Sequence, residues 1–528
     1  MIWTVNTRAD VVRGEARGVS IDANGTISLA PRLTELFKTD QPYIWSSAID
    51  AAGNIYLGTG ADGKVFKVDA NGKGSLFADL DELNVSALAI GKGGEIFAAT
   101  SPDGKVYRLD ASGKATVYFD PSEKYVWALA AASDGSLVVA TGDNGKIFKV
   151  KTAGATADSS LLLDTGETHV ISLAADKSGN VYAGTDPNGL VLKIGADGKA
   201  FALLDAPLRE IHQLAVAPDG SVYALALSDS VNAKTETTTT TTAATESKPV
   251  TVERPTIAPA ETPKSRYDLS TAKSAVFRIL PDGGSDLFWS SPSVVAFSVY
   301  AHLNNQGVLV GTADKGRIYN VSNDLTERLV LQSDEGQVST ILTNGKRLFA
   351  TSSNQGKLYQ FGPDLNAEGA YESAVLDAKA VSNWGRIWWR STGGVSVQTR
   401  SGNTEKPDET WSGWVAAAAD PKGVQITSPK ARYFQWRATF RGEGTLSEVN
   451  VSFLSRNIAP EVTSVQVLAA NIGLAPNPAV ALDPNIESSG MDPALFGVQV
   501  AAVAPRRLFQ KGARAIQWTA GRLEPAFK

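Results

Sequence analysis

The chain of 528 residues contains no cysteine, three histidines and two methionines. Without cysteine it has no disulfide, no thiolate metal ligand and no cysteine nucleophile, although this leaves the cellular compartment open. It also lacks an apolar run of the roughly 18 residues that a membrane-spanning helix needs. We therefore expect no membrane span. The net charge of -5 provides no basic surface, so we expect no nucleic-acid binding either.

Catalytic motifs are equally scarce. The stretch GTGADG, from Gly58 to Gly63, matches a dinucleotide-binding pattern, but the KVFKVD that follows alternates like a strand, whereas that motif needs a helix. Aspartates recur in tight turns at Asp62, Asp103, Asp143 and Asp186. Turn chemistry alone favours aspartate at such places, so the sequence predicts no metal site and no cofactor.

What the chain does contain is a repeat. DGKVFKVDANGK begins at Asp62, DGKVYRLDASGK begins 41 residues later at Asp103, and NGKIFKVKTAGA begins another 41 residues later at Asn144. Seven first strands begin at Tyr43, Asn84, Tyr125, His169, Ile211, Val294 and Gln337. Asp-Gly and Asn-Gly turns suit hairpins, and four short strands per repeat indicate the blades of a β-propeller.

The ends of the repeat region predict how the ring closes. The stretch TELFKTD at Thr34–Asp40 matches the fourth strands of the repeats, although no repeat precedes it. The seventh repeat loses its period after Phe361 and therefore lacks a fourth strand of its own. We predict that Thr34–Asp40 pairs antiparallel with Lys357–Phe361 and closes a seven-bladed, all-β propeller. The alternative outer strand is YESAVLD at Tyr371–Asp377.

The first strands of the seven repeats carry the predicted core. At one equivalent position of these strands, which forms one column, the side chain is mostly bulky: Ser47, Leu88, Leu129, Leu173, Leu214, Phe297 and Ile341. The next column is mostly small: Ala48, Ala89, Ala130, Ala174, Ala215, Ser298 and Leu342. Because successive side chains point to opposite faces of a strand, each blade presents a bulky face and a small face that can interdigitate with its neighbours.

Composition divides the chain into four regions. We predict an N-terminal extension at 1–30, the propeller at 31–368, a β-sandwich at 369–457, and at 458–528 a linker with an incomplete immunoglobulin- or fibronectin-like start. A Thr/Pro-rich insertion at 231–272 interrupts the fifth repeat and is expected to be disordered or extended. The third region holds six of the eleven tryptophans, which serve either a sugar-binding face or core packing.

Two regions resemble known families. The pattern NIYLGT followed by DGKVFKVD resembles the NHL, YVTN and quinoprotein-type propellers of bacteria, and it lacks the signature of tryptophan-aspartate repeats. The third region, with WGRIWW, VQTRSGN, WSGW and YFQWRATF, resembles a discoidin-like jelly roll. The resemblance implies a periplasmic or secreted protein, its signal peptide absent from this chain, and a jelly roll of a kind that often binds carbohydrate. We expect a truncated chain.

The predicted working face collects the fourth-to-first connections and the second-to-third turns, which lie on one side because successive strands run antiparallel. Its candidate binding residues are Tyr43, Trp45, Tyr125, Trp127, His169, Glu210 and His212. In the other repeats the position of Trp45 and Trp127 holds Ser86, Ile171, His212, Val295 and Ser339. Core packing between blades would not tolerate such changes of size, so we expect partner binding or packing against neighbouring loops.

Two functions follow from the sequence. The first is a non-enzymatic, extracytoplasmic binding or scaffold protein whose loop face takes a protein or glycan partner. The second, which the resemblance implies, is a propeller enzyme of the streptogramin-lyase or lactonase type, with a metal-assisted site near His169 and His212. Fold alone does not decide between them, because the resembling families include enzymes, sensors and scaffolds.

Overall fold

The computed structural model describes most of the chain. The described residues are 1–151, 157–195, 197–228, 268–418, 420 and 422–455, with the backbone of β38 (Ile472–Leu474) and β39 (Leu508–Gln510). The chain divides into two compact units, Met1–Arg456 and Asn457–Lys528, and everything below concerns the first. Nearly all of the Thr/Pro-rich insertion and, apart from two short strands, the predicted linker and immunoglobulin-like start lie outside the described residues.

Each repeat is built of four antiparallel strands that pair with one another, as predicted for propeller blades. A single pair, Gly142 opposite His169, joins the third repeat to the fourth, and β29 (Glu327–Gln332) joins the sixth repeat to the N-terminal strands. The first two repeats contain β6 (Tyr43–Ile49), β7 (Ile55–Gly60), β8 (Lys64–Val68), β9 (Gly74–Asp79), β10 (Asn84–Ile90), β11 (Ile96–Ser101), β12 (Val106–Leu109) and β13 (Ala115–Phe119). The next two contain β14 (Tyr125–Ala131), β15 (Ser136–Gly142), β16 (Lys146–Lys151), β17 (Asp158–Asp164), β18 (His169–Ala175), β19 (Val181–Asp186), β20 (Leu190–Ile194) and β21 (Ala200–Asp205).

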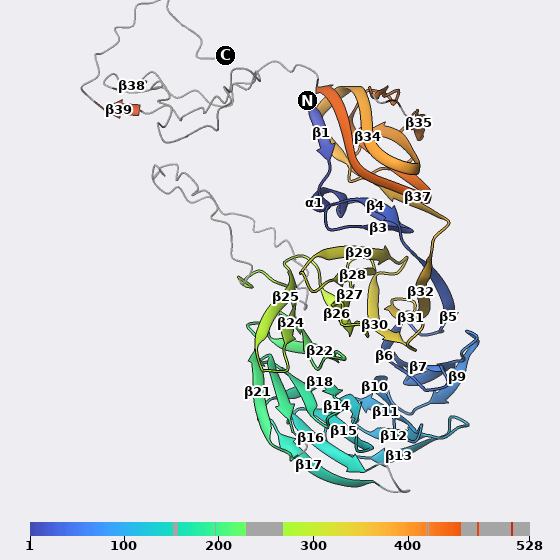
Figure 1. The fold of residues 1–528 in the computed structure, drawn as a ribbon, viewed down its shortest axis with the longest axis vertical. Helices are drawn as coiled ribbons and strands as arrows, with labels where there is room; N and C mark the ends of the chain where they lie inside the picture. Colours follow the sequence, from blue (N-terminus) through green and yellow to red (C-terminus); the bar gives the residue numbers. More distant parts are fainter. Residues whose placement is uncertain are drawn as a thin grey trace, which may run out of the picture. The chain divides into compact units, whose positions relative to one another are not determined.

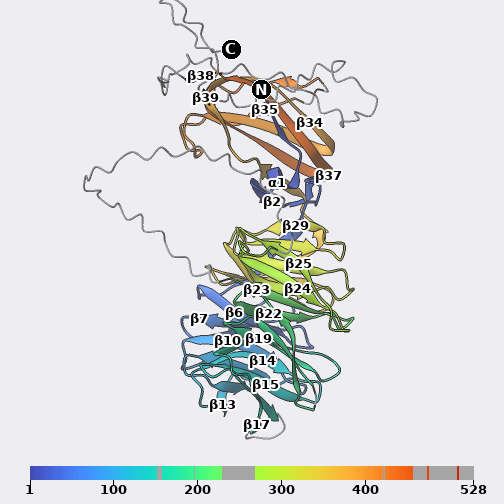
Figure 2. The same cartoon turned by 90° about the vertical axis from the view of Figure 1, so that its left-hand side faces the viewer.

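The remaining repeats follow the same plan. The fifth contains β22 (Glu210–Val216), β23 (Val222–Leu227), β24 (Ser274–Ile279) and β25 (Ser285–Ser291). The sixth and seventh contain β26 (Ala296–Ala301), β27 (Val308–Thr312), β28 (Arg317–Val321), β29 (Glu327–Gln332), β30 (Gln337–Thr343), β31 (Leu348–Ser353) and β32 (Lys357–Leu365). Figure 1 shows these sheets around a common centre, with the first strand of each nearest to it, and in Figure 2 β6, β10 and β14 follow one another in successive layers.

The ring closes as predicted. β5 (Pro31–Lys38) pairs antiparallel with β32 as the outermost strand of the seventh repeat, with Thr34 opposite Gln360. At the centre β30 contacts β6, where the hydroxyls of Ser47 and Thr340 lie 2.6 Å apart. The alternative outer strand is wrong, because β33 (Glu368–Glu372) pairs with β2 (Glu15–Arg17) and β37 (Ala431–Ser455) instead.

The turn glycines explain why the repeat is so regular. Gly63 has a φ of +58°, and a Cβ atom on it would lie 2.1 Å from the carbonyl oxygen of Glu82. Its N–H donates to the carbonyl of Leu83, so the second-to-third turn lies against the connection to the next repeat. Gly104 makes the same approach to the carbonyl of Glu123. Both sets of loops therefore share one face, which confirms the predicted placement.

The register predicted for the sixth repeat is wrong by two residues. Ser298 lies opposite Gly311, as Ser46 lies opposite Gly58 in the first repeat. A Cβ atom on Gly311 would lie 2.3 Å from the Ser298 hydroxyl, so this close approach needs glycine and fixes the register. Phe297 therefore occupies the position assigned to Val295, and the predicted core columns contain Val299 and Tyr300 in place of Phe297 and Ser298.

The C-terminal β-region, residues 368–455, is built on two long bent strands, β37 and β34 (Leu376–Gly402), which pair along both of their halves. β35 (Val415–Ala417) and β36 (Val424–Gln425) pair with the edge of β34. Large side chains fill its interior: Tyr371, Trp436, Phe434 and Phe440 are fully buried. The likeness to a discoidin-like jelly roll stays a prediction.

The first 30 residues, expected to be an extension, supply strands to this region. β1 (Ile2–Val5) pairs with β37, β3 (Val19–Ile21) pairs with β29, and β4 (Ile27–Leu29) joins β3 and β37. Between them lies the four-residue helix α1 (Arg8–Val11), capped by the Thr7 side chain. Within the described residues no helix is long and apolar enough to span a membrane.

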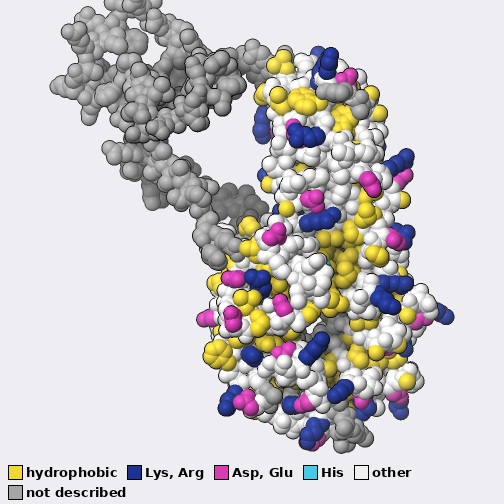
Figure 3. Space-filling view, viewed as in Figure 1, with side chains coloured by type: hydrophobic (Ala, Val, Ile, Leu, Met, Phe, Trp, Pro, Cys, Tyr) yellow, Lys and Arg dark blue, Asp and Glu magenta, His cyan; other side chains and the backbone are white. Residues whose placement is uncertain are grey.

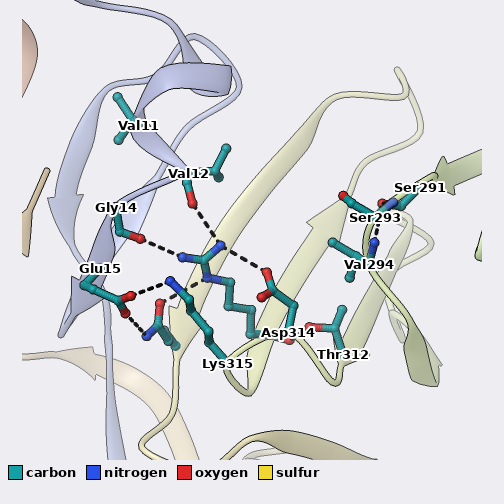
Figure 4. A network of polar contacts seen from close by, with 12 residues as sticks. Val11, Val12, Gly14, Glu15, Ser291, Ser293, Val294, Thr312, Asp314 and Lys315 are labelled. Carbon is teal, nitrogen blue, oxygen red and sulfur yellow. Dashed lines mark hydrogen bonds and ion pairs between the residues drawn. The ribbon is translucent and has the colours of Figure 1, made fainter. Parts of the chain in front are cut away.

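A buried arginine fastens this N-terminal segment to the sixth repeat, as Figure 4 shows. The guanidinium of Arg317, which is 3% exposed, donates to the carbonyls of Val12 at 3.0 Å and Gly14 at 2.8 Å. The hydroxyl of Tyr371 donates to the carbonyl of Val11 at 2.7 Å, and burial raises the pKa of that tyrosine. Segments more than 300 residues apart are thus joined by buried hydrogen bonds, which are costly to leave unmade.

Candidate functional site

Two stacked aromatic pairs mark the loop face. The rings of Tyr43 and Trp45 lie 5.3 Å apart at an angle of 18°, and those of Tyr125 and Trp127 lie 4.8 Å apart at the same angle. Trp45 is 45% exposed and Tyr43 is 40% exposed, whereas the second pair is half-buried. Both pairs stand at the start of an innermost strand, where the connecting loops gather. The prediction that Trp45 and Trp127 lie outside the interblade core is therefore consistent with their exposure.

Each pair rests on a glycine at the end of the second strand. Gly60 lies opposite Tyr43, and a Cβ atom on it would lie 2.0 Å from Nε1 of Trp45. Gly142 lies opposite Tyr125, and its Cβ atom would lie 2.3 Å from Nε1 of Trp127. Four repeats without tryptophan place a larger residue there: Ser101, Asp186, Leu227 and Ser353. Glycine thus gives the indole room to lie against the second strand.

The next repeat supplies a polar group to each pair. Nε1–H of Trp127 donates to Nδ1 of His169 at 3.2 Å, and the backbone N–H of Asp143 donates to the same atom at 3.3 Å. Because two donors converge on Nδ1, this geometry assigns the proton of the neutral ring to Nε2. In the first pair the equivalent acceptor is Oδ1 of Asn84, which receives the N–H of Ala61 at 3.4 Å. The contact of Ala61 with Asn84 thus corresponds to that of Asp143 with His169.

Ion pairs hold the loops that frame the second aromatic pair. The side chain of Glu123 is 4% exposed and accepts from Nζ of Lys146 at 2.7 Å and Nδ2 of Asn144 at 2.6 Å. The hydrogen bond to Glu123 raises the pKa of Lys146. Beside them, Nζ of Lys124 lies 4.8 Å from the ring centroid of Tyr125, whose hydrogen bond raises the pKa of that lysine. The rim of the site is therefore preorganised and carries one exposed cation.

The other predicted residues form a separate cluster. Nδ1 of His212 lies 2.6 Å from Oε1 of Glu210, and its ring meets the ring of Phe297 edge-on at 5.6 Å. Phe297 was not among the predicted site residues, because the apolar run VVAF fits two strand registers and one of them places Phe297 in the core. The serine opposite a glycine, Ser298 with Gly311, was the signal that could have found it.

The structure brings the seven candidate residues together in three clusters and not in one. Tyr43 lies with Trp45, Tyr125 and Trp127 lie with His169, and Glu210 lies with His212. The two histidines predicted to share a metal-assisted site thus have different polar partners. Across the described part of the chain, no group of three or more His, Asp or Glu side chains is arranged to hold a metal ion.

The tryptophans of the C-terminal β-region are mostly used for packing. Trp384, Trp411 and Trp436 are buried. Trp414 contacts two guanidinium groups, with the Cζ atoms of Arg400 and Arg437 at 4.3 and 4.6 Å from a ring centroid. Core packing, one of the two uses expected from the sequence, is observed for Trp436. Among the described residues, the stacked pair of exposed aromatic side chains, Tyr43 and Trp45, lies on the propeller loop face.

The comparisons with known proteins concern the fold. No family model and no curated protein sequence matches the chain. Among solved structures it is similar to a streptogramin B lyase, with 13% identity, a TM-score of 0.48 and coverage of 64% of this chain and 98% of that one. Virginiamycin B lyase from Staphylococcus aureus is 11% identical, with a TM-score of 0.47 and coverage of 63% of this chain and 99% of that one. The WD40 repeats of RRP9 are 12% identical, with a TM-score of 0.46 and coverage of 64% of this chain and 100% of that one. At these values the similarity carries no argument about activity.

Proposed function

We propose that the chain is a non-enzymatic binding protein that takes a protein or glycan partner on the loop face of its propeller. The observation that carries this proposal is the pair of stacked Tyr–Trp platforms, each seated on a glycine. A binding face of this kind suits an extracytoplasmic scaffold, the location expected from the sequence resemblance. The C-terminal β-region is proposed as a second contact surface.

Exposure favours binding over packing as the role of the platforms. A tryptophan used only for the core would be buried, whereas 45% of Trp45 and 40% of Tyr43 are exposed. Exposed tryptophan and tyrosine are the residues enriched among binding hot spots, and their flat faces also stack on sugar rings. The seat on Gly60 and the stack hold the rings in place before a partner arrives, which lowers the entropy that binding costs.

Site-specific photo-crosslinking tests the proposal. A photoreactive phenylalanine analogue at Tyr43 or Tyr125 should capture the partner in cells of the native host, whereas the same analogue at Phe201 should not. Phe201 is the matched control because it is 70% exposed on an outer strand, away from the loop face. For a glycan partner, purified wild type should bind members of a glycan array that the double variant Trp45→Leu, Trp127→Leu does not bind. Equal capture at Tyr43 and Phe201, together with unchanged array binding, would contradict the proposal.

A second candidate is the propeller enzyme with a metal-assisted site near His169 and His212. The Glu210–His212 pair supports it, because a carboxylate 2.6 Å from Nδ1 orients an imidazole as a general base requires. Elemental analysis of the purified protein distinguishes the two. A stoichiometric divalent ion that disappears in the double variant His169→Ala, His212→Ala would favour the enzyme, and the same analysis without such an ion favours the binding protein.

A further inference from the structure

A groove opens at the seam where the ring closes, on the face opposite the aromatic platforms. It has a volume of about 710 Å³ and lies between the sixth and seventh repeats. Leu309, Val330, Leu348 and Phe361 form its apolar floor, and His302 and Asn320 stand in its wall. Figure 3 shows hydrophobic side chains gathered where Figure 1 draws β28, β29 and β32.

The closure itself explains why the groove occurs at this place. In the first two repeats a tight turn joins the third strand to the fourth at this face, with the N–H of Gly72 donating to the carbonyl of Asp69 and that of Gly113 to the carbonyl of Asp110. In the seventh repeat the two strands come from distant parts of the chain, so no such turn covers their ends. Pro31 and Pro363 instead line the opening, where the chain enters and leaves the ring.

The chemistry of the groove suits a small ligand. Its volume falls within the range of roughly 300 to 1,000 Å³ that is usual for small-molecule sites. Leu309 and Phe361 are each 3% exposed, so the floor is firm and apolar. In the wall, Nε2 of His302 lies 2.7 Å from Oδ1 of Asn320, and Nδ2 of Asn320 donates to the hydroxyl of Ser322 at 3.1 Å. This leaves a directional set of polar groups beside an apolar surface.

The lining of the groove holds one cation, Arg328, and one anion, Asp324, and both side chains have polar partners. Nε of Arg328 lies 3.1 Å from Oδ1 of Asp22. Oδ1 of Asp324 accepts from the N–H and the hydroxyl of Thr326 at 3.2 and 2.8 Å. A charged ligand would have to replace or repel one of these partners, so the lining favours a neutral molecule.

We propose that the seam groove binds a small neutral molecule with an apolar body and one hydrogen-bonding end, such as a hydroxyl or an amide. The body lies on the floor formed by Leu309 and Phe361, and the polar end meets His302 and Asn320. This site is separate from the loop face and does not depend on the function proposed there.

Titration with the neutral fluorescent probe N-phenyl-1-naphthylamine tests the proposal. Wild type should bind one probe per chain with saturation. Val330→Trp, which fills the groove, should raise the Kd at least tenfold, and Leu365→Asp should raise it severalfold. Leu365 lines the rim and is 58% exposed, so its substitution leaves the fold intact and decides the question if Val330→Trp does not fold. The control Phe201→Asp should bind as wild type does.

Competition tests the neutral character of the ligand. We expect 1-octanol to displace the probe at much lower concentration than octanoate, which has the same chain with a charged end. Equal displacement by both compounds would overturn the assignment of a neutral ligand. A wild type without saturable binding, or a Leu365→Asp variant with the wild-type Kd, would overturn the site.

Discussion

Closure of the ring by an N-terminal strand can be tested with an engineered disulfide. Thr34 in β5 lies directly opposite Gln360 in β32. Opposed residues of antiparallel strands have Cα atoms about 4.5 to 5.5 Å apart, within the range of about 4.4 to 6.8 Å that a disulfide spans. Both side chains lie outside the buried core, and the chain has no cysteine of its own. The variant Thr34→Cys, Gln360→Cys should therefore oxidise to a single intramolecular bond.

The expected stabilisation follows from the length of chain enclosed. The bond would close a loop of roughly 330 residues, for which the chain-entropy relation gives about 6 kcal/mol, while measured disulfides reach about 5 kcal/mol. Urea unfolding of the oxidised and reduced forms should thus differ by at least about 2 kcal/mol in the free energy of unfolding. Peptide mapping identifies the bond.

The control keeps one cysteine and shifts the other out of register. Lys38 lies opposite Lys357, four residues along β5 from Thr34, which corresponds to about 13 Å. The variant Lys38→Cys, Gln360→Cys should therefore stay reduced under the same conditions. If it oxidises as readily as the variant at Thr34, or if oxidation at Thr34 brings no added stability, the closure by β5 is refuted.

Three further predictions concern the site and the blades. Gly142→Ala should displace Trp127, lower stability by about 1 to 3 kcal/mol and change the tryptophan emission, whereas Gly413→Ala, whose Cβ atom meets nothing within 4 Å, should not. Glu123→Ala should lower the free energy of unfolding, measured in urea, by about 1 to 3 kcal/mol, because the side chains of Asn144 and Lys146 lose their common acceptor. Burial and the charge of Asp50 raise the pKa of Tyr56 to about 12. The stabilisation of the fold by the protonated Tyr56 is therefore fully present below pH 10 and is lost as the pH rises to about 12. Melting curves of Tyr56→Phe should lack this loss.

The repeats and the closure could be predicted from the sequence because their signals are local and recur. Asp-Gly and Asn-Gly dipeptides mark the hairpins, and Thr34–Asp40 matches the fourth strands although it stands outside the repeats. The strands of the first 30 residues could not be predicted in this way. Glu15–Arg17 and Ile27–Leu29 are only three residues long. The first pairs with a strand hundreds of residues away, and the second joins nearby Val19–Ile21 to the distant strand β37.

The candidate site shows the same division. The position of Trp45 and Trp127 on the loop face follows from strand direction alone, so the sequence could place them. The donation from Trp127 to His169 joins two repeats and depends on a glycine, Gly142, that reads as an ordinary turn residue. Phe297 was assigned to the core, because apolar residues on both sides of it allowed a second register.

The affinity of the captured partner for a platform variant tests the central claim most directly. Calorimetry would compare wild type with the double variant Trp45→Leu, Trp127→Leu, in which leucine keeps an apolar side chain over each glycine. If the Tyr–Trp platforms form the binding face, the Kd should rise at least tenfold, while the circular dichroism spectrum and the unfolding midpoint stay close to those of wild type. An unchanged Kd in a folded double variant would contradict the account.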